Sequence, residues 1–167
     1  MILFGKKLTL VVVCKANITR SAYLHGYMEH LLRERMPHAR KKMRILSAGV
    51  RARSGGSASQ VVRHVARLNG FSLRNHRSDP LSKKLVRKAD VFLVMERWQK
   101  DELVERFPAA KGKTFLLTEY LRKDDLDAVR DVPDPTGRYV GDYEEFIAVA
   151  HSETDRIFRE LAYADLI

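Results

Sequence analysis

A cysteine and an arginine lie six positions apart near the start of the chain, at Cys14 and Arg20, and Ser21 directly follows the arginine. A thiolate is a strong nucleophile, and a guanidinium can grip two oxygens of one phosphate. The backbone N–H groups of a loop this long can converge on an anion, and the start of a helix adds partial positive charge. The spacing therefore predicts a phosphate-binding cradle, in which Cys14 reacts as the thiolate and the Ser21 hydroxyl donates to its sulfur.

The alternative is that Cys14 is structural, because a lone cysteine is most often a small buried apolar residue. Cys14 is the single cysteine of the chain, so neither an internal disulfide nor a cysteine-based zinc site is available to it. An apolar strand-like run precedes it and a helix-like segment follows Arg20. This context favours the cradle over the structural alternative.

The elements that must position these residues alternate between strand and helix. Apolar runs predict strands at residues 8–13, 43–48, 91–95 and 114–117, and helical spacing marks 21–36, 58–68, 82–88, 98–107 and 143–166. Such alternation predicts an α/β fold with a four-stranded parallel sheet and helices on both faces. Ligands of these sheets bind beyond the carboxyl ends of the strands, where Cys14 would lie. We expect residues 1–167 to form a single domain.

The charge of the chain favours anionic partners in general, with 31 Lys and Arg against 21 Asp and Glu, or +10. The most basic segment, residues 38–44, is short and has no aromatic residue, which is typical of a solvated edge. We therefore expect neither a membrane partner nor a nucleic acid partner. The longest early apolar run, residues 8–14, is well below the roughly 18 residues that cross a bilayer, and the basic residues after it do not fit a cleavable signal. A cytoplasmic location is expected.

The segment VVVCKANITRS, residues 11–21, resembles the signature of low-molecular-weight protein tyrosine phosphatases, a strand followed by Cys-x-Gly-Asn-Ile-Cys-Arg-Ser. Four further segments resemble family motifs: Ser47-Ala48-Gly49, Asn75-His76-Arg77-Ser78, Val94-Met95-Glu96 and Val132-Pro133-Asp134-Pro135. The resemblance covers nearly the whole chain. It implies a phosphotyrosine phosphatase I-like fold and hydrolysis of phosphotyrosine in proteins through a cysteinyl-phosphate intermediate, with no cofactor and no metal.

The resemblance also implies roles for individual residues. Cys14 would be the nucleophile, Arg20 would bind the phosphate and Asp134 would be the general acid. The phosphate-binding residues would be Lys15, Ala16, Asn17, Ile18, Thr19, Arg20 and Ser21, and Ser47 and His76 would support the loop together with Asn17. Asp134 is preferred to Asp131 because Pro135 follows it, although Asp-Pro pairs are often simple turn formers.

Two departures from the family signature lie within the cradle. Ala16 stands where glycine is usual, which adds one methyl group. Thr19 stands where many members have a second cysteine, so Cys14 cannot be protected in a disulfide and is expected to oxidise further. The lone thiol also argues against the related arsenate reductases, which need additional cysteines.

The walls of the substrate cleft depart more strongly. Arg53, Thr136 and Gly137 occupy places where tyrosine-directed members carry aromatic residues, and Tyr139 or Tyr143 would have to supply a ring instead. Arg51 and Arg53 could meet acidic residues beside a phosphotyrosine. Ile18 is the residue usual in the tyrosine-directed branch, whereas the phosphoarginine-directed branch often has threonine there.

The alternatives are a phosphatase for a small or non-tyrosine phosphomonoester, which the altered walls favour, and a catalytically silent phosphate- or nucleic-acid-binding module. The expected partner is a phosphotyrosine protein, and the resemblance suggests an autophosphorylating tyrosine kinase.

Overall fold

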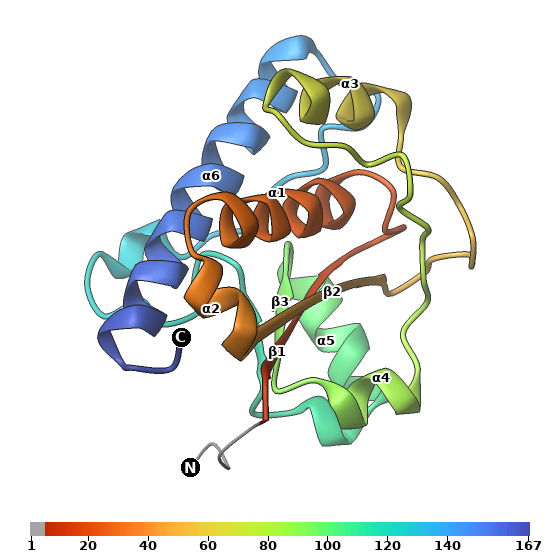
Figure 1. The fold of residues 1–167 in the computed structure, drawn as a ribbon. Coiled ribbons are helices and arrows are strands. Elements are labelled where there is room, and N and C mark those ends of the chain that lie inside the picture. The colour runs from red at the N-terminus through yellow and green to blue at the C-terminus, as the bar shows by residue number, and fades with distance from the viewer. Residues whose placement is uncertain (1–5) are drawn as a thin grey trace.

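A computed structural model describes residues 6–167 (Figure 1). Its four strands are β1 (Leu8–Cys14), β2 (Met43–Gly49), β3 (Val91–Val94) and β4 (Thr114–Leu116), and they form one sheet in the order β2-β1-β3-β4. Every neighbouring pair is parallel, with Leu8 opposite Met43 and Leu10 opposite Val91. The expected four-stranded parallel sheet is confirmed.

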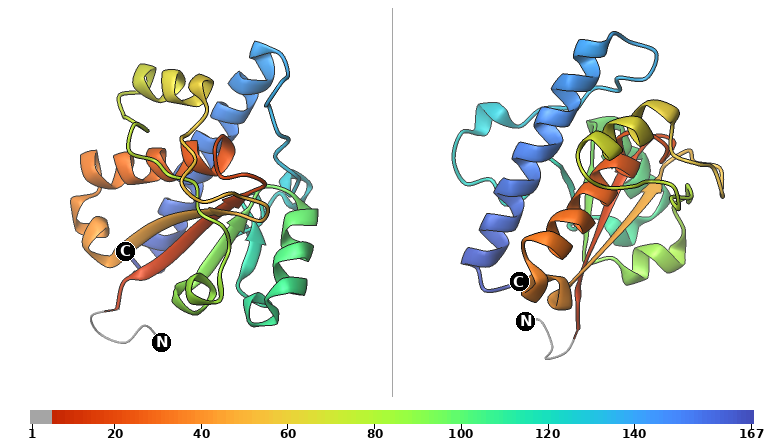
Figure 2. Two further views of the ribbon diagram at one scale, coloured as in Figure 1. Left: turned by 90° about the vertical axis from the view of Figure 1, so that its right-hand side faces the viewer. Right: turned by 45° about the horizontal axis from the view of Figure 1, so that its top comes forward.

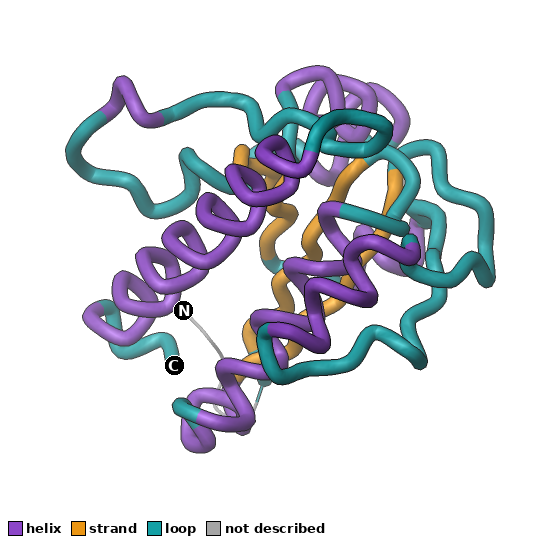
Figure 3. Tube along the Cα trace, turned by 90° about the horizontal axis from the view of Figure 1, so that it is seen from above, coloured by secondary structure: helices purple, strands orange, loops and turns teal. Residues whose placement is uncertain are grey.

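Six α-helices accompany the sheet: α1 (Arg20–Glu34), α2 (Pro37–Lys42), α3 (Gln60–Leu68), α4 (Lys83–Lys88), α5 (Arg97–Arg106) and α6 (Val140–Tyr163). Short 3₁₀ turns lie at Pro108–Ala110 and Leu126–Ala128. Figure 2 shows helices on both faces of the sheet, with α1 and α6 on one side and α4 and α5 on the other. The same layering is visible from above in Figure 3, where helices flank the central strands.

The sheet has a hydrophobic core on each face, and β1 contributes to both. Leu10 and Val12 pack into the cluster formed with α1 and α6, whereas Val11 and Val13 pack into the cluster formed with α4 and α5. All four side chains are fully buried. Burial on both faces explains why β1 is a continuous apolar run rather than an alternating one.

The structure shifts several predicted boundaries by one to three residues and adds one helix. Arg20 and Ser21 both lie in the first turn of α1, so the helix begins at the cradle. Pro37 does not simply end a helix: it occupies the first turn of α2, where its missing N–H costs nothing. Most of the basic segment at residues 38–44 therefore lies in α2. Within residues 6–167, no helix has the length and apolar character needed to span a membrane.

Candidate active site

The loop between β1 and α1, residues 15–19, is held in shape by Asn17. This residue is fully buried and has a φ of 56°, in the left-handed region that costs energy for a side chain other than glycine. Three hydrogen bonds fix it there: its Nδ2 donates to Ser21 Oγ at 2.8 Å, its Oδ1 accepts from the N–H of Asp79 at 2.9 Å, and its carbonyl contacts His76 Nε2 at 2.7 Å. The left-handed bend of the loop is thus held by one nearby residue, Ser21, and by two that are far away in the sequence, His76 and Asp79.

The Cys14 thiol lies at the bottom of this loop and faces Ser21. Its Sγ is 3.1 Å from Ser21 Oγ, and the residue is 3% exposed. Asn17 donates to Ser21 Oγ, so the hydroxyl hydrogen of Ser21 must go to another acceptor, and the sulfur at 3.1 Å is nearer than the Ala48 carbonyl oxygen at 3.5 Å. Such a donor stabilises negative charge on sulfur.

Arg20 is buried beneath the mouth of the cradle and is held by residues far away in the sequence. Its Nη1 donates to a Glu96 carboxylate oxygen and to the carbonyl oxygen of Val132 at 2.8 Å. Its side chain is only 2% exposed, so the Glu96 charge compensates for burying the guanidinium. These contacts fix the plane of the arginine without occupying Nη2, which faces Asp134 at 3.3 Å.

Glu96 is a site residue to which the sequence reasoning gave no role. It lies two positions after the last residue of β3, at the same edge of the sheet as Cys14, and the rule that ligands bind at this edge would have pointed to it. The residue has a second task, because it begins α5 with a capping box in which its side chain and that of Gln99 satisfy each other's backbone N–H groups.

Asp134 reaches the cradle from the loop before α6. Its Oδ2 is 3.3 Å from Arg20 Nη2, and its Oδ1 accepts from the N–H of Thr136 at 3.0 Å. Burial by itself raises the pKa of Asp134, but the hydrogen bonds from Thr136 and the charges of Arg20 and Lys15 outweigh burial and leave the pKa below its usual value. The resting carboxyl is therefore ionised at neutral pH.

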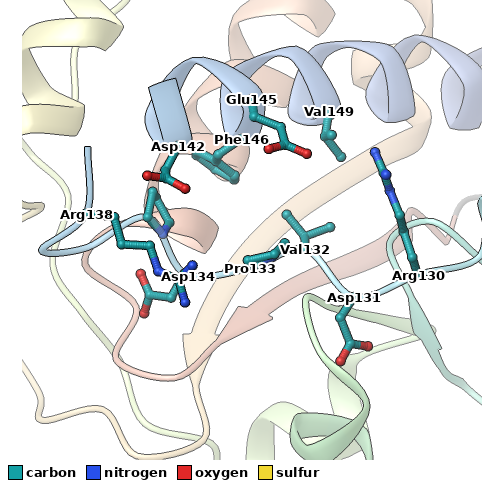
Figure 4. Close-up of a pocket in the computed structure, with 11 residues that line it drawn as sticks. Arg130, Asp131, Val132, Pro133, Asp134, Arg138, Asp142, Glu145, Phe146 and Val149 are labelled. Atoms are coloured by element: carbon teal, nitrogen blue, oxygen red, sulfur yellow. The ribbon is translucent and has the colours of Figure 1, made fainter. Parts of the chain in front are cut away.

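Asp131 lies on the same loop but serves another element. Its Oδ1 accepts from the backbone N–H of Arg97 at 3.0 Å and from the Arg97 guanidinium at 3.3 Å, at the start of α5. Figure 4 shows the Asp131 and Asp134 side chains pointing in different directions from the loop. Of the two carboxylates, Asp134 is the one brought to Arg20.

A cavity of about 220 Å³ lies between this loop and α6 (Figure 4). Arg130, Arg138 and Phe146 are among its lining residues, but neither Cys14 nor Arg20 is. Val132 and Asp134, which both contact Arg20, line it too, so the cavity adjoins the Cys14 loop on the side of Asp134. Among the described residues, no three His, Cys, Asp or Glu side chains gather closely enough to hold a metal ion.

Thr19 connects the cradle to two other segments. Its hydroxyl is 3.3 Å from the hydroxyl of Ser59, which comes just before α3. It is also 3.3 Å from the hydroxyl of Thr136, on the loop that carries Asp134. The residue that replaces the usual cysteine thus bridges the phosphate loop and the loop that carries Asp134. A thiol would form weaker hydrogen bonds at the same place.

Of the two tyrosines considered in the sequence as a source of an aromatic ring, one is exposed. Tyr143 packs against the core, whereas Tyr139 is 86% exposed. Arg51 is engaged elsewhere, with its guanidinium 2.8 Å from Glu102 and 4.9 Å from the centre of the Trp98 ring. Arg53 is exposed, and its carbonyl oxygen accepts from the Ser78 hydroxyl, which ties this rim loop down.

The expected support for the loop from Ser47 takes a different form. His76 does contact Asn17, but Ser47 Oγ lies 3.0 Å from Nδ1 of His25 on α1. Burial, together with the nearby His76, lowers the pKa of His25 from 6.5 to about 4. His25 follows Ser21 by four positions on the same helix face, and this spacing is the signal that could have revealed it.

His25 is expected to make the protein less stable in mild acid. Its folded pKa of about 4 lies below 6.5, so the unfolded chain binds the proton more readily, and stability falls as the pH drops from 6.5 towards 4. The shift corresponds to about 3 kcal/mol once the pH is below 4. Urea unfolding across this range should show a smaller acid loss for His25→Gln than for the native protein. The exposed His64→Gln is the matched control, and equal pH dependence in all three proteins would contradict the assignment.

Comparison with known proteins identifies similar chains. The family model described as low molecular weight phosphotyrosine protein phosphatase matches residues 9–164. A probable low molecular weight protein-tyrosine-phosphatase, EpsP of Ralstonia nicotianae, is 36% identical over 122 residues, which cover 73% of this chain and 79% of that protein. A protein-arginine-phosphatase of Geobacillus stearothermophilus is 33% identical over 153 residues, which cover 92% of this chain and 93% of that protein.

Solved structures show the same two kinds of relative. The YwlE arginine phosphatase of Geobacillus stearothermophilus superposes with a TM-score of 0.82 and 30% identity, covering 95% of this chain and 96% of that one. The tyrosine phosphatase Wzb of Escherichia coli K30, solved with sulphate, gives 0.77 and 27%, covering 92% and 97%.

Proposed function

The chain belongs to the low molecular weight phosphotyrosine protein phosphatase family, whose model spans residues 9–164, and we propose that it hydrolyses phosphotyrosine in proteins with Cys14, Arg20 and Asp134 as its catalytic residues. One observation supports these residues above all. The Cys14 thiol faces a hydroxyl donor at the bottom of an anion-binding loop, and at the mouth of that loop Arg20 and Asp134 lie 3.3 Å apart.

In the first step, the Cys14 thiolate attacks phosphorus in line with the bond to the leaving oxygen. The phosphate oxygens accept from the backbone N–H groups of residues 15–21 and from the Arg20 guanidinium, which stabilise the transition state. Asp134 protonates the leaving phenolate as the P–O bond breaks. The products of this step are a free tyrosine side chain and a phosphate bonded to Cys14.

In the second step, water replaces sulfur on phosphorus. Asp134, now a carboxylate, takes a proton from the attacking water, and the S–P bond breaks to regenerate the thiolate and release inorganic phosphate. The Ser21 hydroxyl stabilises the departing sulfur by donating to it. The negative charge of an incoming phosphate dianion repels the Asp134 carboxylate, and the phosphate replaces Asp134 as the partner of Arg20. Both effects raise the pKa of Asp134 and so favour the protonated carboxyl needed in the first step.

Asp134→Asn is expected to lower kcat on a phosphotyrosine peptide by roughly 10² to 10⁴-fold, the usual contribution of a general acid. The acid must be protonated to act, so the native rate should fall as the pH rises through the pKa of Asp134, and the variant should lose this decline. Asp131→Asn is the matched control, because Asp131 bonds the start of α5, and its kcat should stay near the native value. Equal losses in the two variants would show that Asp134 has been wrongly assigned as the acid.

The substrate class is tested by comparing phosphotyrosine, phosphoserine and phosphoarginine peptides of one sequence, with p-nitrophenyl phosphate as a small ester and a chelator present throughout. Phosphotyrosine is expected to give the highest kcat/KM. Two side chains support this expectation, because both could contact the tyrosine ring of the substrate. Ile18 is a half-buried apolar residue of the loop between Cys14 and Arg20, and Tyr139 is an exposed ring that follows Asp134 in the sequence.

Two results would overturn the tyrosine assignment. A higher kcat/KM on phosphoarginine would agree with the similarity to the arginine phosphatases. It would also show that Ile18, which stands where the phosphoarginine-directed branch often has threonine, does not set the selectivity. A higher kcat/KM on the small ester than on any peptide would show that the altered rim at Arg53, Thr136 and Gly137 no longer recognises proteins.

By family resemblance, we also propose an autophosphorylating tyrosine kinase as the phosphoprotein partner and the cytoplasm as the location. A reducing compartment suits a catalytic thiol that has no second cysteine to protect it. Release of phosphate from an autophosphorylated kinase, measured against the same kinase phosphorylated on serine, tests this partner.

A further inference from the structure

Three segments of the chain meet at the edge of the sheet opposite Cys14. Since β2 and β3 run parallel to β1, their first residues lie beside the start of β1, far from the cradle at its end. The helix α2 ends directly before β2, and α4 ends shortly before β3. In Figure 1 both short helices lie at the lower end of the strands, on either side of the start of β1.

All three segments are basic. They carry ten Lys and Arg side chains, all exposed, which we call the basic edge: Lys6, Lys7, Arg40, Lys41, Lys42, Arg44, Lys83, Lys84, Arg87 and Lys88. Residues 37–44 and 83–88 contain no Asp or Glu. The other 21 basic residues of the chain equal its 21 acidic residues in number, so the basic edge accounts for the whole excess charge of +10.

Carboxylates on the same side neutralise little of this charge. Asp90 lies 2.7 Å from Lys6, and the highly exposed Asp165 lies 4.0 Å from Lys42. Within residues 6–167, the other eight side chains have no carboxylate within 4.0 Å. Crowded like charges of this kind oppose folding, so their clustering calls for a reason other than stability.

Helix stabilisation explains only part of the pattern. Basic residues in the last turns of α2 and α4 interact favourably with the helix dipole. Lys83 and Lys84, however, occupy the first turn of α4, where positive charge is unfavourable, and Lys6 and Lys7 belong to no helix. An external anionic partner accounts for all three segments.

We propose that the basic edge binds the surface of a bilayer rich in anionic lipid headgroups, with the phosphate cradle facing away from the lipid. Clustered lysines and arginines recognise such surfaces. No aromatic residue lies in residues 37–44 or 83–88, so the stacking platform typical of single-stranded nucleic acid binding is missing from these two segments.

This inference revises the expectation of no membrane partner. That expectation treated residues 38–44 as an isolated short segment, whereas the fold brings α4, Lys6 and Lys7 to the same end of the sheet. The proposal does not depend on hydrolysis, because none of the ten residues belongs to the cradle. On such a surface, the active site would face phosphorylated segments that project from the same membrane.

Sedimentation of the full chain with vesicles tests the proposal. Vesicles of phosphatidylcholine are compared with vesicles in which one third of the lipid is phosphatidylglycerol. The protein is expected to bind the anionic vesicles and to be released by salt, because screening weakens exposed charges. Lys41→Glu combined with Lys88→Glu should weaken this binding by at least about tenfold.

The matched control is Arg67→Glu combined with Arg159→Glu, which changes the net charge equally at exposed positions on α3 and α6. It should bind the anionic vesicles nearly as well as the native protein does. Equal losses in the two double variants would mean that net charge, not the basic edge, drives binding, and would overturn the proposal. Equal binding to both vesicle types would also overturn it, as would binding to a double-stranded oligonucleotide without binding to vesicles. Urea unfolding shows whether each variant is folded without relying on hydrolysis, which separates this test from that of the proposed function.

Discussion

Cys14→Ser protein is expected to hydrolyse p-nitrophenyl phosphate roughly 10⁵-fold or more slowly than the native protein, as is usual when a covalent nucleophile is removed. A serine hydroxyl at this position stays protonated at neutral pH, because no residue beside it acts as a base: the Ser21 hydroxyl is a donor, and Asn17 directs it at residue 14. Initial rates in reducing buffer with a chelator measure the effect.

The same variant should still bind a phosphotyrosine peptide, because Arg20 and the backbone N–H groups of the loop remain in place. Fluorescence anisotropy of a labelled peptide checks this, and an affinity within a few fold of the native value is expected. Activity above about one hundredth of the native rate would show that Cys14 is not the nucleophile. If native, reduced protein were inactive under these conditions, the silent phosphate-binding alternative would replace the enzyme.

The fold was predictable because its elements depend on local sequence. The apolar run that becomes β1 is buried on both faces, and such a run has few alternatives to a central parallel strand. Cys14 and Arg20 could be predicted as a pair for the same reason, since they are six positions apart and lie on one strand-loop-helix unit. The α2 helix was missed because Pro37 signals both the end of one helix and the start of the next.

The supporting contacts were less predictable because they join segments far apart in the chain. Arg20 and Glu96 are 76 positions apart, and only the pairing of β1 with β3 brings them together. Ser47 and His25 meet because β2 packs against α1, a contact that no local pattern encodes. The basic edge has the same origin: each of its segments is short, and its size appears only once the fold brings all three to the same end of the sheet.

Glu96 also bears on how Arg20 works, because Glu96 and Val132 hold Nη1 and leave only Nη2, which faces Asp134 at 3.3 Å, and Nε for a phosphate. A lysine at position 20 would keep the charge but would lose the planar fork that reaches Glu96, Val132 and a phosphate together. Arg20→Lys is therefore expected to lower kcat/KM on a phosphotyrosine peptide by roughly 10³-fold, through the transition state.

Glu96→Gln separates orientation from charge in the same assay. The amide oxygen can still accept from Nη1, so Arg20 keeps its direction, but the buried guanidinium loses a compensating charge. A much smaller loss than in Arg20→Lys is expected, together with a lower unfolding temperature. If Arg20→Lys retained activity within about tenfold of the native protein while folding normally, positive charge alone would suffice for transition-state binding. The fork geometry set by Glu96 and Val132 would then have no catalytic role.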